Sequence, residues 1–147
     1  MAPAMLNDVD KAFLNTVSEY NLSQVELGNI AGSLAEDESL QEFGNTIALT
    51  HAKRQDELSK LAALTHHPLP VVAGAQNEEI MKVLLANKEN FDSLYIHEQC
   101  IRLAGIKTRL VQEQQLGLQQ DIKNYAGGLL TDVGEYIRIA DSFAGKY

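Results

Sequence analysis

Two polar side chains, His51 and Arg54, interrupt a helical stripe that is otherwise apolar. They belong to the segment TIALTHAKRQDELSKL (46–61), in which Ile47, Leu58 and Leu61 recur at helical spacing. His51 follows Ile47 by four residues and Arg54 precedes Leu58 by four, so both lie on the same stripe. A polar side chain on a buried helix face costs free energy unless it finds a partner. The segment therefore predicts either a buried polar cluster or a stripe that faces water at this level.

A second candidate site is the pair His66 and His67, which lies in the proline-containing segment THHPLPVVAG (65–74). Imidazole is a good ligand for Zn, Cu and Ni, so the pair could hold a metal at the surface. Adjacent histidines in a flexible loop can equally be solvated side chains without a ligand. Both interpretations remain open from the sequence.

Several classes of catalytic site are not supported by the residues. A di-iron bundle site needs Glu-x-x-His pairs on two helices, and the nearest approach, His97 followed by Glu98, places adjacent residues on different faces. The single cysteine, Cys100, excludes an internal disulfide and a thiolate metal cluster. We find neither a Ser/His/Asp spacing nor a glycine-rich phosphate loop. No motif therefore predicts an enzymatic activity.

The elements that must position these residues are helices. Apolar residues at helical spacing predict four long amphipathic helices, with a short helical piece in the connection between the second and the third. We expect Asn7 to cap the first helix and the second helix to end near Leu64, followed by a loop from Thr65 to Gly74. Asn77 should cap the short helical piece Ile80–Leu85. The third long helix should run from Phe91 to near Gly117, and Asp121 should cap the fourth.

This arrangement predicts the fold class. Four long helices with a longer, proline-containing connection between the second and third are typical of an all-α four-helix bundle. A length of 147 residues is sufficient for one domain with one core, so we expect a single domain over 1–147 with a flexible N-terminal segment, 1–6.

Composition excludes several partners. The formal net charge of −8 argues against nucleic acid, which requires clustered Lys and Arg, and disfavours anionic membrane surfaces. No apolar run approaches the roughly 18–20 residues of a transmembrane segment. The opening MAPAMLNDVD has neither a basic nor an apolar region, so we expect no signal peptide within it.

Four stretches of the chain, in order, carry a family resemblance. They are FLNTVSEYNLSQVELGNIA, FGNTIALTHAKRQDELSKLA, the proline loop and FDSLYIHEQC. In order and spacing they resemble the ferritin-like domain of unknown function numbered 4142, over roughly residues 9–140. The resemblance implies a ferritin-like four-helix bundle that is usually exported to the periplasm or attached to the outer membrane. The family has no settled activity.

The resemblance also implies a metal site, which this chain retains in part. Glu26 and His51 are the two of its metal-binding positions that match here; we expect no cofactor, and a transition metal such as Fe or Zn at these residues is the alternative. The family's Asp before the histidine is Thr50 here, and its further histidines on the third and fourth helices fall on Leu103 and Tyr136. The resemblance therefore implies a degenerate site.

The alternative for the same residues is a structural polar cluster. Arg54, three residues after His51, carries a permanent positive charge that would repel a cation. Glu26 could instead accept hydrogen bonds from Arg54 or His51, and Tyr136 could reach the same level with its hydroxyl. Such a buried cluster can fix the register of helices. We favour this interpretation over a ligand site.

These observations predict a non-enzymatic protein of the cell envelope, periplasmic or associated with the outer membrane. We expect it to act as a binding or structural module for an unknown protein or small-molecule partner. Two alternatives remain: a metal- or haem-handling protein that uses Glu26 and His51, and a homo-oligomer that associates through its glycine-rich fourth helix.

Overall fold

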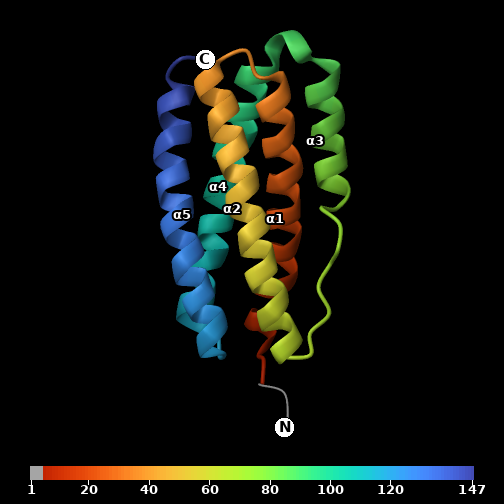
Figure 1. Ribbon diagram of the computed structural model, residues 1–147. Coiled ribbons are helices and arrows are strands. Elements are labelled where there is room, and N and C mark those ends of the chain that lie inside the picture. Colours follow the sequence, from red (N-terminus) through yellow and green to blue (C-terminus); the bar gives the residue numbers. More distant parts are fainter. Residues whose placement is uncertain (1–4) are drawn as a thin grey trace.

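The computed structural model describes residues 5–147, and over this range every regular element is helical (Figure 1). The elements are α1 (Asp8–Leu34), α2 (Glu38–Leu64), α3 (Ala75–Ala86), the 3₁₀ turn η1 (Lys88–Asn90), α4 (Phe91–Leu116) and α5 (Gln120–Ala144). The four long helices form a bundle, and α3 lies outside it. The predicted all-α bundle with a long connection between its second and third long helices is confirmed.

The bundle consists of two helical hairpins. α1 packs most extensively against α2, and α4 packs most extensively against α5, while α1 also contacts α4 and α2 also contacts α5. The chain between α2 and α4 runs back along the whole length of the bundle beside α1 (Figure 1). As a consequence, α2 and α4 point in the same direction.

Several helix ends follow directly from local sequence. Asn7 caps α1 as predicted, and its side chain and that of Asp10 each accept a backbone N–H of the other residue. α4 starts at Phe91 and ends before Gly117, also as predicted. These ends are determined by residues within one helical turn, which is why the sequence alone locates them.

Two predicted caps are wrong. α3 begins two residues earlier than the predicted cap, after Gly74, whose φ of 94° suits a residue without a side chain. Asn77 is the third residue of α3 and turns its side chain toward α1, so it cannot cap the helix. The cap of α5 is Gln119, which accepts the N–H of Asp121. Asp121 instead lies in the first turn of α5, where its charge suits the helix dipole.

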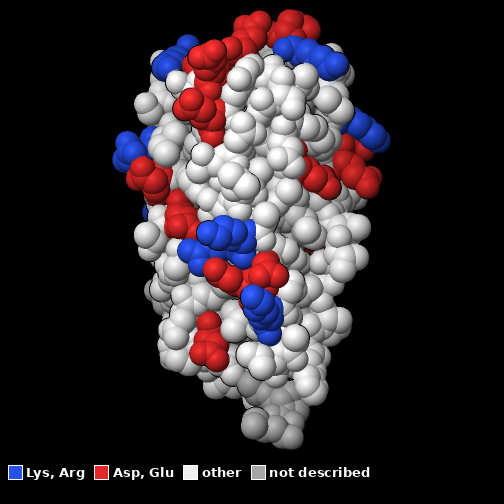
Figure 2. Space-filling view, viewed as in Figure 1, with Lys and Arg blue, Asp and Glu red and all other residues white. Residues whose placement is uncertain are grey.

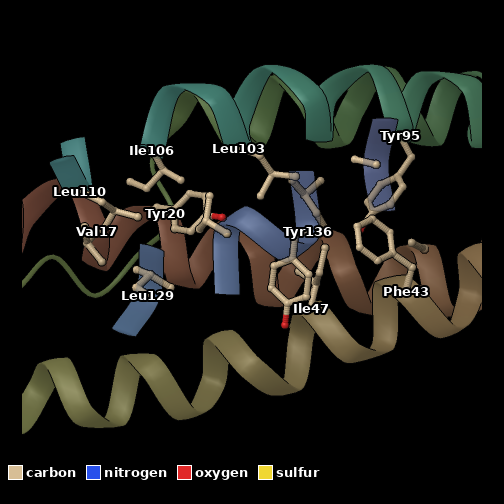
Figure 3. Close-up of a cluster of buried hydrophobic side chains, with 14 of the residues drawn as sticks. Val17, Tyr20, Phe43, Ile47, Tyr95, Leu103, Ile106, Leu110, Leu129 and Tyr136 are labelled. Atoms are coloured by element: carbon tan, nitrogen blue, oxygen red, sulfur yellow. The ribbon is translucent and has the colours of Figure 1, made fainter. Parts of the chain in front are cut away.

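The core is made of aliphatic and aromatic side chains from all four long helices, with additions from α3 (Figure 3). Glycines allow α1 and α2 to approach closely, because a Cβ at Gly28 would collide with the carbonyl oxygen of Gly44. In the predicted flexible segment, residues 1–4 lie outside the described range. Leu6 packs against the core, while Met5 is exposed.

The described helices carry charge in a mixed pattern. On the face shown in Figure 2, basic side chains are interspersed with acidic ones, and acidic side chains gather at the upper end, where α1 turns into α2. None of the helices in the described range has a stretch apolar and long enough to cross a lipid bilayer.

Candidate functional site

His51 lies at the centre of the bundle on α2 and is fully buried. Its Nδ1 is 2.8 Å from the carbonyl oxygen of Ile47 one turn earlier. A carbonyl oxygen can only accept, so Nδ1 carries the proton and Nε2 carries the lone pair. Among residues 5–147, Nε2 has no hydrogen-bond partner. A buried acceptor without a donor costs roughly 1–3 kcal/mol, so this nitrogen is an energetically unfavourable feature of the bundle centre.

The surroundings keep His51 neutral. Burial lowers the pKa of its imidazole to about 4, because the charged form loses its hydration, and the guanidinium of Arg54 lowers the pKa further. The Ile47 carbonyl and the carboxylate of Asp132 act in the opposite direction but do not overcome burial. At physiological pH the ring is therefore an uncharged group inside an apolar core.

Two tyrosines flank the imidazole. The ring of Tyr20 from α1 meets it edge-on at 5.0 Å between centroids, and the ring of Tyr136 from α5 lies at 6.0 Å. The hydroxyl of Tyr136 points toward α2, where it donates to Oγ1 of Thr50 at 2.7 Å (Figure 3). Thr50 and Tyr136, at the positions where the resemblance implies an Asp and a His, are thus hydrogen-bonded to each other.

The structure does not bring Glu26 to His51. Glu26 is exposed on α1 and accepts a hydrogen bond from Nδ2 of Asn77 at 2.6 Å, on the side of α1 that faces α3. Each residue of a helix is rotated by about 100° from the previous one, and it is the next residue, Leu27, that enters the core. The expectation that Glu26 pairs with His51 or Arg54 is therefore wrong.

Arg54 pairs across to α5 instead. Its Nε and Nη2 each lie 2.8 Å from Oδ2 of Asp132, and its Nη1 lies 3.0 Å from Glu57. Both side chains of the Arg54–Asp132 pair remain partly solvated, at 21% and 27% exposed. The sequence reasoning missed Asp132, which lies one turn before Tyr136 on the same helix. That spacing is the only local signal for it.

A second polar contact crosses the centre between α1 and α4. The side-chain amides of Gln24 and Gln99 donate to each other at 2.9 and 2.7 Å, and Gln24 also donates to the hydroxyl of Tyr20 at 3.2 Å. Both glutamines are fully buried. The sequence analysis missed them, although Gln99 follows Ile96 by three residues and precedes Leu103 by four, on the apolar stripe of α4.

The bundle centre therefore offers few metal ligands. Leu103 is buried and apolar at the position where the resemblance implies a histidine (Figure 3). Within the described range, no group of three or more His, Cys, Asp or Glu side chains is arranged to hold a metal ion. The Nε2 atom of His51 has a lone pair, free among the described residues, that could bind a metal, and the rings of Tyr20 and Tyr136 lie beside it.

The loop histidines differ in their contacts. Nε2 of His67 lies 2.9 Å from Oδ1 of Asn15, which ties the loop to α1. His66 is exposed and adopts a left-handed backbone with φ 53°. A second hydrogen bond joins this loop to α1, because the hydroxyl of Ser18 donates to the carbonyl oxygen of Pro70 at 2.7 Å. These bonds give the segment a structural role along α1.

A buried carboxyl pair lies where α1 begins and α4 ends. Asp10 accepts backbone N–H groups from Asn7 at 3.1 Å and from Leu118 and Gln119 at 3.2 Å. Glu113 is equally inaccessible, and neither of its oxygens has a hydrogen-bond partner within residues 5–147. Burial raises the pKa of Glu113 to about 8, and the adjacent carboxyl of Asp10 adds to the effect. Glu113 therefore holds a proton at neutral pH.

Comparison with protein families identifies the chain. Residues 1–142 match the family model described as "Domain of unknown function (DUF4142)". The chain belongs to this family. No curated protein and no solved structure matches the chain. Membership of DUF4142 therefore supports the resemblance seen in the sequence but brings no activity with it, and function must be argued from the site.

Proposed function

We propose that this DUF4142 protein is a non-enzymatic, ferritin-like binding or structural module of the cell envelope whose central metal site has been replaced by a neutral polar layer. The observation that carries the proposal is the environment of His51. Its imidazole is flanked by the rings of Tyr20 and Tyr136, and the carboxylate of Glu26 lies on the side of α1 that faces α3.

The chemistry of these groups supports this reading. A divalent cation inside a helical bundle is normally held by several ligands, of which some are carboxylates that compensate its charge. Here His51 supplies one neutral nitrogen. Burial raises the pKa of the Tyr20 hydroxyl well above its usual range, so that side chain stays uncharged as well. The permanent charge of Arg54 adds an unfavourable potential for a cation.

One observation favours the alternative of a metal- or haem-handling protein. The lone pair on Nε2 of His51 is the form of imidazole that binds transition metals, and it lacks a donor among the described residues. A metal that reached this atom would remove an unsatisfied polar group. The two functions can be separated by measuring bound metal.

The experiment uses protein purified without a His-tag and loaded separately with Fe²⁺, Zn²⁺, Cu²⁺ and Mn²⁺, followed by elemental analysis. We expect less than one equivalent of tightly bound metal, with equal values in the wild type, in His51→Gln and in the exposed-site control His97→Ala. Stoichiometric metal that His51→Gln alone abolishes would refute the proposal. Metal lost only in a His66→Ala/His67→Ala variant would belong to the surface loop.

Placement in the envelope rests on the family resemblance and is tested separately. We expect fractionation of cells that express the natural gene to recover the protein in the periplasmic or outer-membrane fraction. Recovery with cytosolic markers would contradict this part of the proposal and leave the metal question untouched. Light scattering over a range of concentrations tests the remaining alternative, since a constant monomer mass would exclude self-association.

A further inference from the structure

A cleft lies on the side of the bundle, and His51 is not among the residues that line it. It has a volume of about 400 Å³ and is bounded by α1, by the first turn of α3 and by α4. This volume falls within the range of small-molecule sites, roughly 300–1,000 Å³. The connection between α2 and α4 runs along α1 (Figure 1), and residues within 73–80 of this connection form one wall of the cleft.

The wall of the cleft contains Arg102, which has no ion-pair partner among residues 5–147. Arg102 of α4 donates through Nη1 to the hydroxyl of Ser23 and through Nη2 to Oδ1 of Asn77, and both acceptors are neutral. Its Nε is buried and finds no acceptor in the described chain, and no carboxylate there lies within ion-pairing distance. By contrast, Arg54 and Arg138 each contact a carboxylate.

A partly buried guanidinium with neutral partners is unusual in a chain of net charge −8. Removal of a charge from water costs several kcal/mol unless an opposite charge compensates it. Burial accordingly lowers the pKa of Arg102, against the opposing field of Glu98. An anion that entered the cleft would supply the missing charge, and a carboxylate matches the planar geometry of the guanidinium.

The first turn of α3 faces the same space. Gly74, Ala75, Gln76 and Asn77 all line the cleft, and within residues 5–147 no side chain caps this helix. The backbone N–H groups at the start of a helix attract anions. Because Arg102 donates a hydrogen bond to Asn77 in this turn, the guanidinium and the N–H groups at the start of α3 can both attract an anion in the same cleft.

The remaining walls limit what kind of anion fits. Arg109 adds a second positive charge, but the carboxylates of Glu19 and Glu98 also line the cleft and repel a highly charged ligand. Ile80 and Ile101 form apolar surface beside the charged groups. A ligand with one negative charge and a short apolar body matches this combination better than a phosphate or a polyanion.

We propose that this cleft binds a small amphiphilic monocarboxylate, with its carboxylate on Arg102 and the first turn of α3 and its apolar part against Ile80 and Ile101. The site is separate from His51. The inference goes beyond the proposed function, because it holds whether or not the bundle centre binds metal and wherever the protein resides.

The first test titrates ¹⁵N-labelled protein with butyrate, hexanoate and inorganic phosphate while NMR spectra are recorded. We expect saturable shifts in the amides of residues 74–77 and in the Nε–H of Arg102 with the carboxylates, tighter binding of hexanoate than of butyrate, and weaker binding of phosphate. A preference for phosphate would overturn the proposed ligand class, and the absence of saturable shifts at these groups would overturn the site.

A matched pair of glycine substitutions tests the location. A Cβ at Gly105, which lines the cleft, would lie in open space, with no atom of another turn or helix within 4 Å, and the same holds for Gly134 on α5, outside the cleft. Gly105→Leu should therefore fill the cleft and abolish hexanoate binding, while Gly134→Leu should leave it unchanged. Equal binding by both variants would refute the assignment.

Substitution of the arginine tests the charge. Arg102→Gln should weaken hexanoate binding about tenfold or more, because it removes a charge-assisted hydrogen bond, while Arg138→Gln at an exposed ion pair should have no effect. If Arg102→Gln fails to fold, Arg102→Lys keeps the charge, and we expect intermediate affinity because the forked contact is lost. Wild-type affinity in the variant that folds would contradict the role of Arg102.

Discussion

The buried carboxyl pair makes a sharp prediction about how stability depends on pH. Glu113 in the folded protein keeps its proton up to about pH 8, while in the unfolded chain it loses the proton near its usual value of 4.5. The folded state therefore binds more protons across this window, and stability must fall as the pH rises through it. Glu113→Gln removes the titrating proton and retains the shape of the side chain.

The size of the effect follows from the part of the window in which the contribution of Glu113 dominates. Below pH 6.5, His51 has a contribution of opposite sign, because its pKa is lowered from 6.5 to about 4. Between pH 6.5 and 8 the contribution of His51 fades while that of Glu113 continues, at about 1.4 kcal/mol for each pH unit. We expect the wild type to lose about 2 kcal/mol of unfolding free energy over this range, and Glu113→Gln to lose little.

The assay is urea unfolding followed by circular dichroism at pH 6.5, 7.25, 8 and 9. The two proteins should have similar stability at pH 6.5 and diverge as the pH rises, with the variant more stable at pH 9. Glu42→Gln, which changes an exposed carboxylate on α2, serves as the control and should follow the wild type. Parallel pH profiles for wild type and Glu113→Gln would show that the buried carboxyl is already ionised at pH 6.5, and the reasoning would fail.

Three further predictions concern the bundle. Because the folded-state pKa of His51 lies below its unfolded value, its contribution falls by about 2–3 kcal/mol between pH 6.5 and 4, against the opposing gain from Glu113. The unfolding free energy of the wild type relative to His51→Leu should therefore fall by that amount in urea unfolding. Arg54→Ala should cost about 1 kcal/mol in the same assay, since its partner Asp132 stays partly solvated; a cost above 3 would mean that the pair is effectively buried. Gly28→Ala should destabilise the protein by roughly 1–3 kcal/mol, because the added Cβ collides with α2. Gly134→Ala, where the Cβ would lie in open space, should stabilise it by about 0.5–1 kcal/mol. An unchanged stability of Gly28→Ala would show that α1 and α2 can move apart without cost.

The helices could be predicted because their signals are local. Apolar periodicity, the Asn7 capping box and the break at Gly117 each act within a few residues, and the structure has the corresponding helices. Asn77 shows the limit of this approach. Its residue type suits a cap, but its side chain accepts from Ser23 and donates to Glu26, both of which lie more than 50 residues away in the sequence.

The candidate site was predictable only in part for the same reason. The position of His51 on an apolar stripe indicates a buried polar group, and the structure buries it fully. Which partners it would meet depends on the rotation of α1 and α5 about their axes. A rotation of about 100° separates Glu26 from the core position of Leu27, and the family pattern contains no information about that angle. Asp132, the true partner of Arg54, became identifiable only once α5 was placed beside α2.

Hydrogen bonds between side chains of different helices align the bundle, and of the residues that form them the sequence predicts only Tyr136 as part of the polar cluster. Gln24 and Gln99 satisfy each other only when α1 and α4 are aligned so that both amides face one another. A shift of one helical turn would bury two amides without partners, at roughly 1–3 kcal/mol each, whereas leucines at these positions would tolerate the shift. Tyr136 and Thr50 impose a similar condition on α5 and α2. Neutral hydrogen bonds between helices thus constrain the register at the bundle centre.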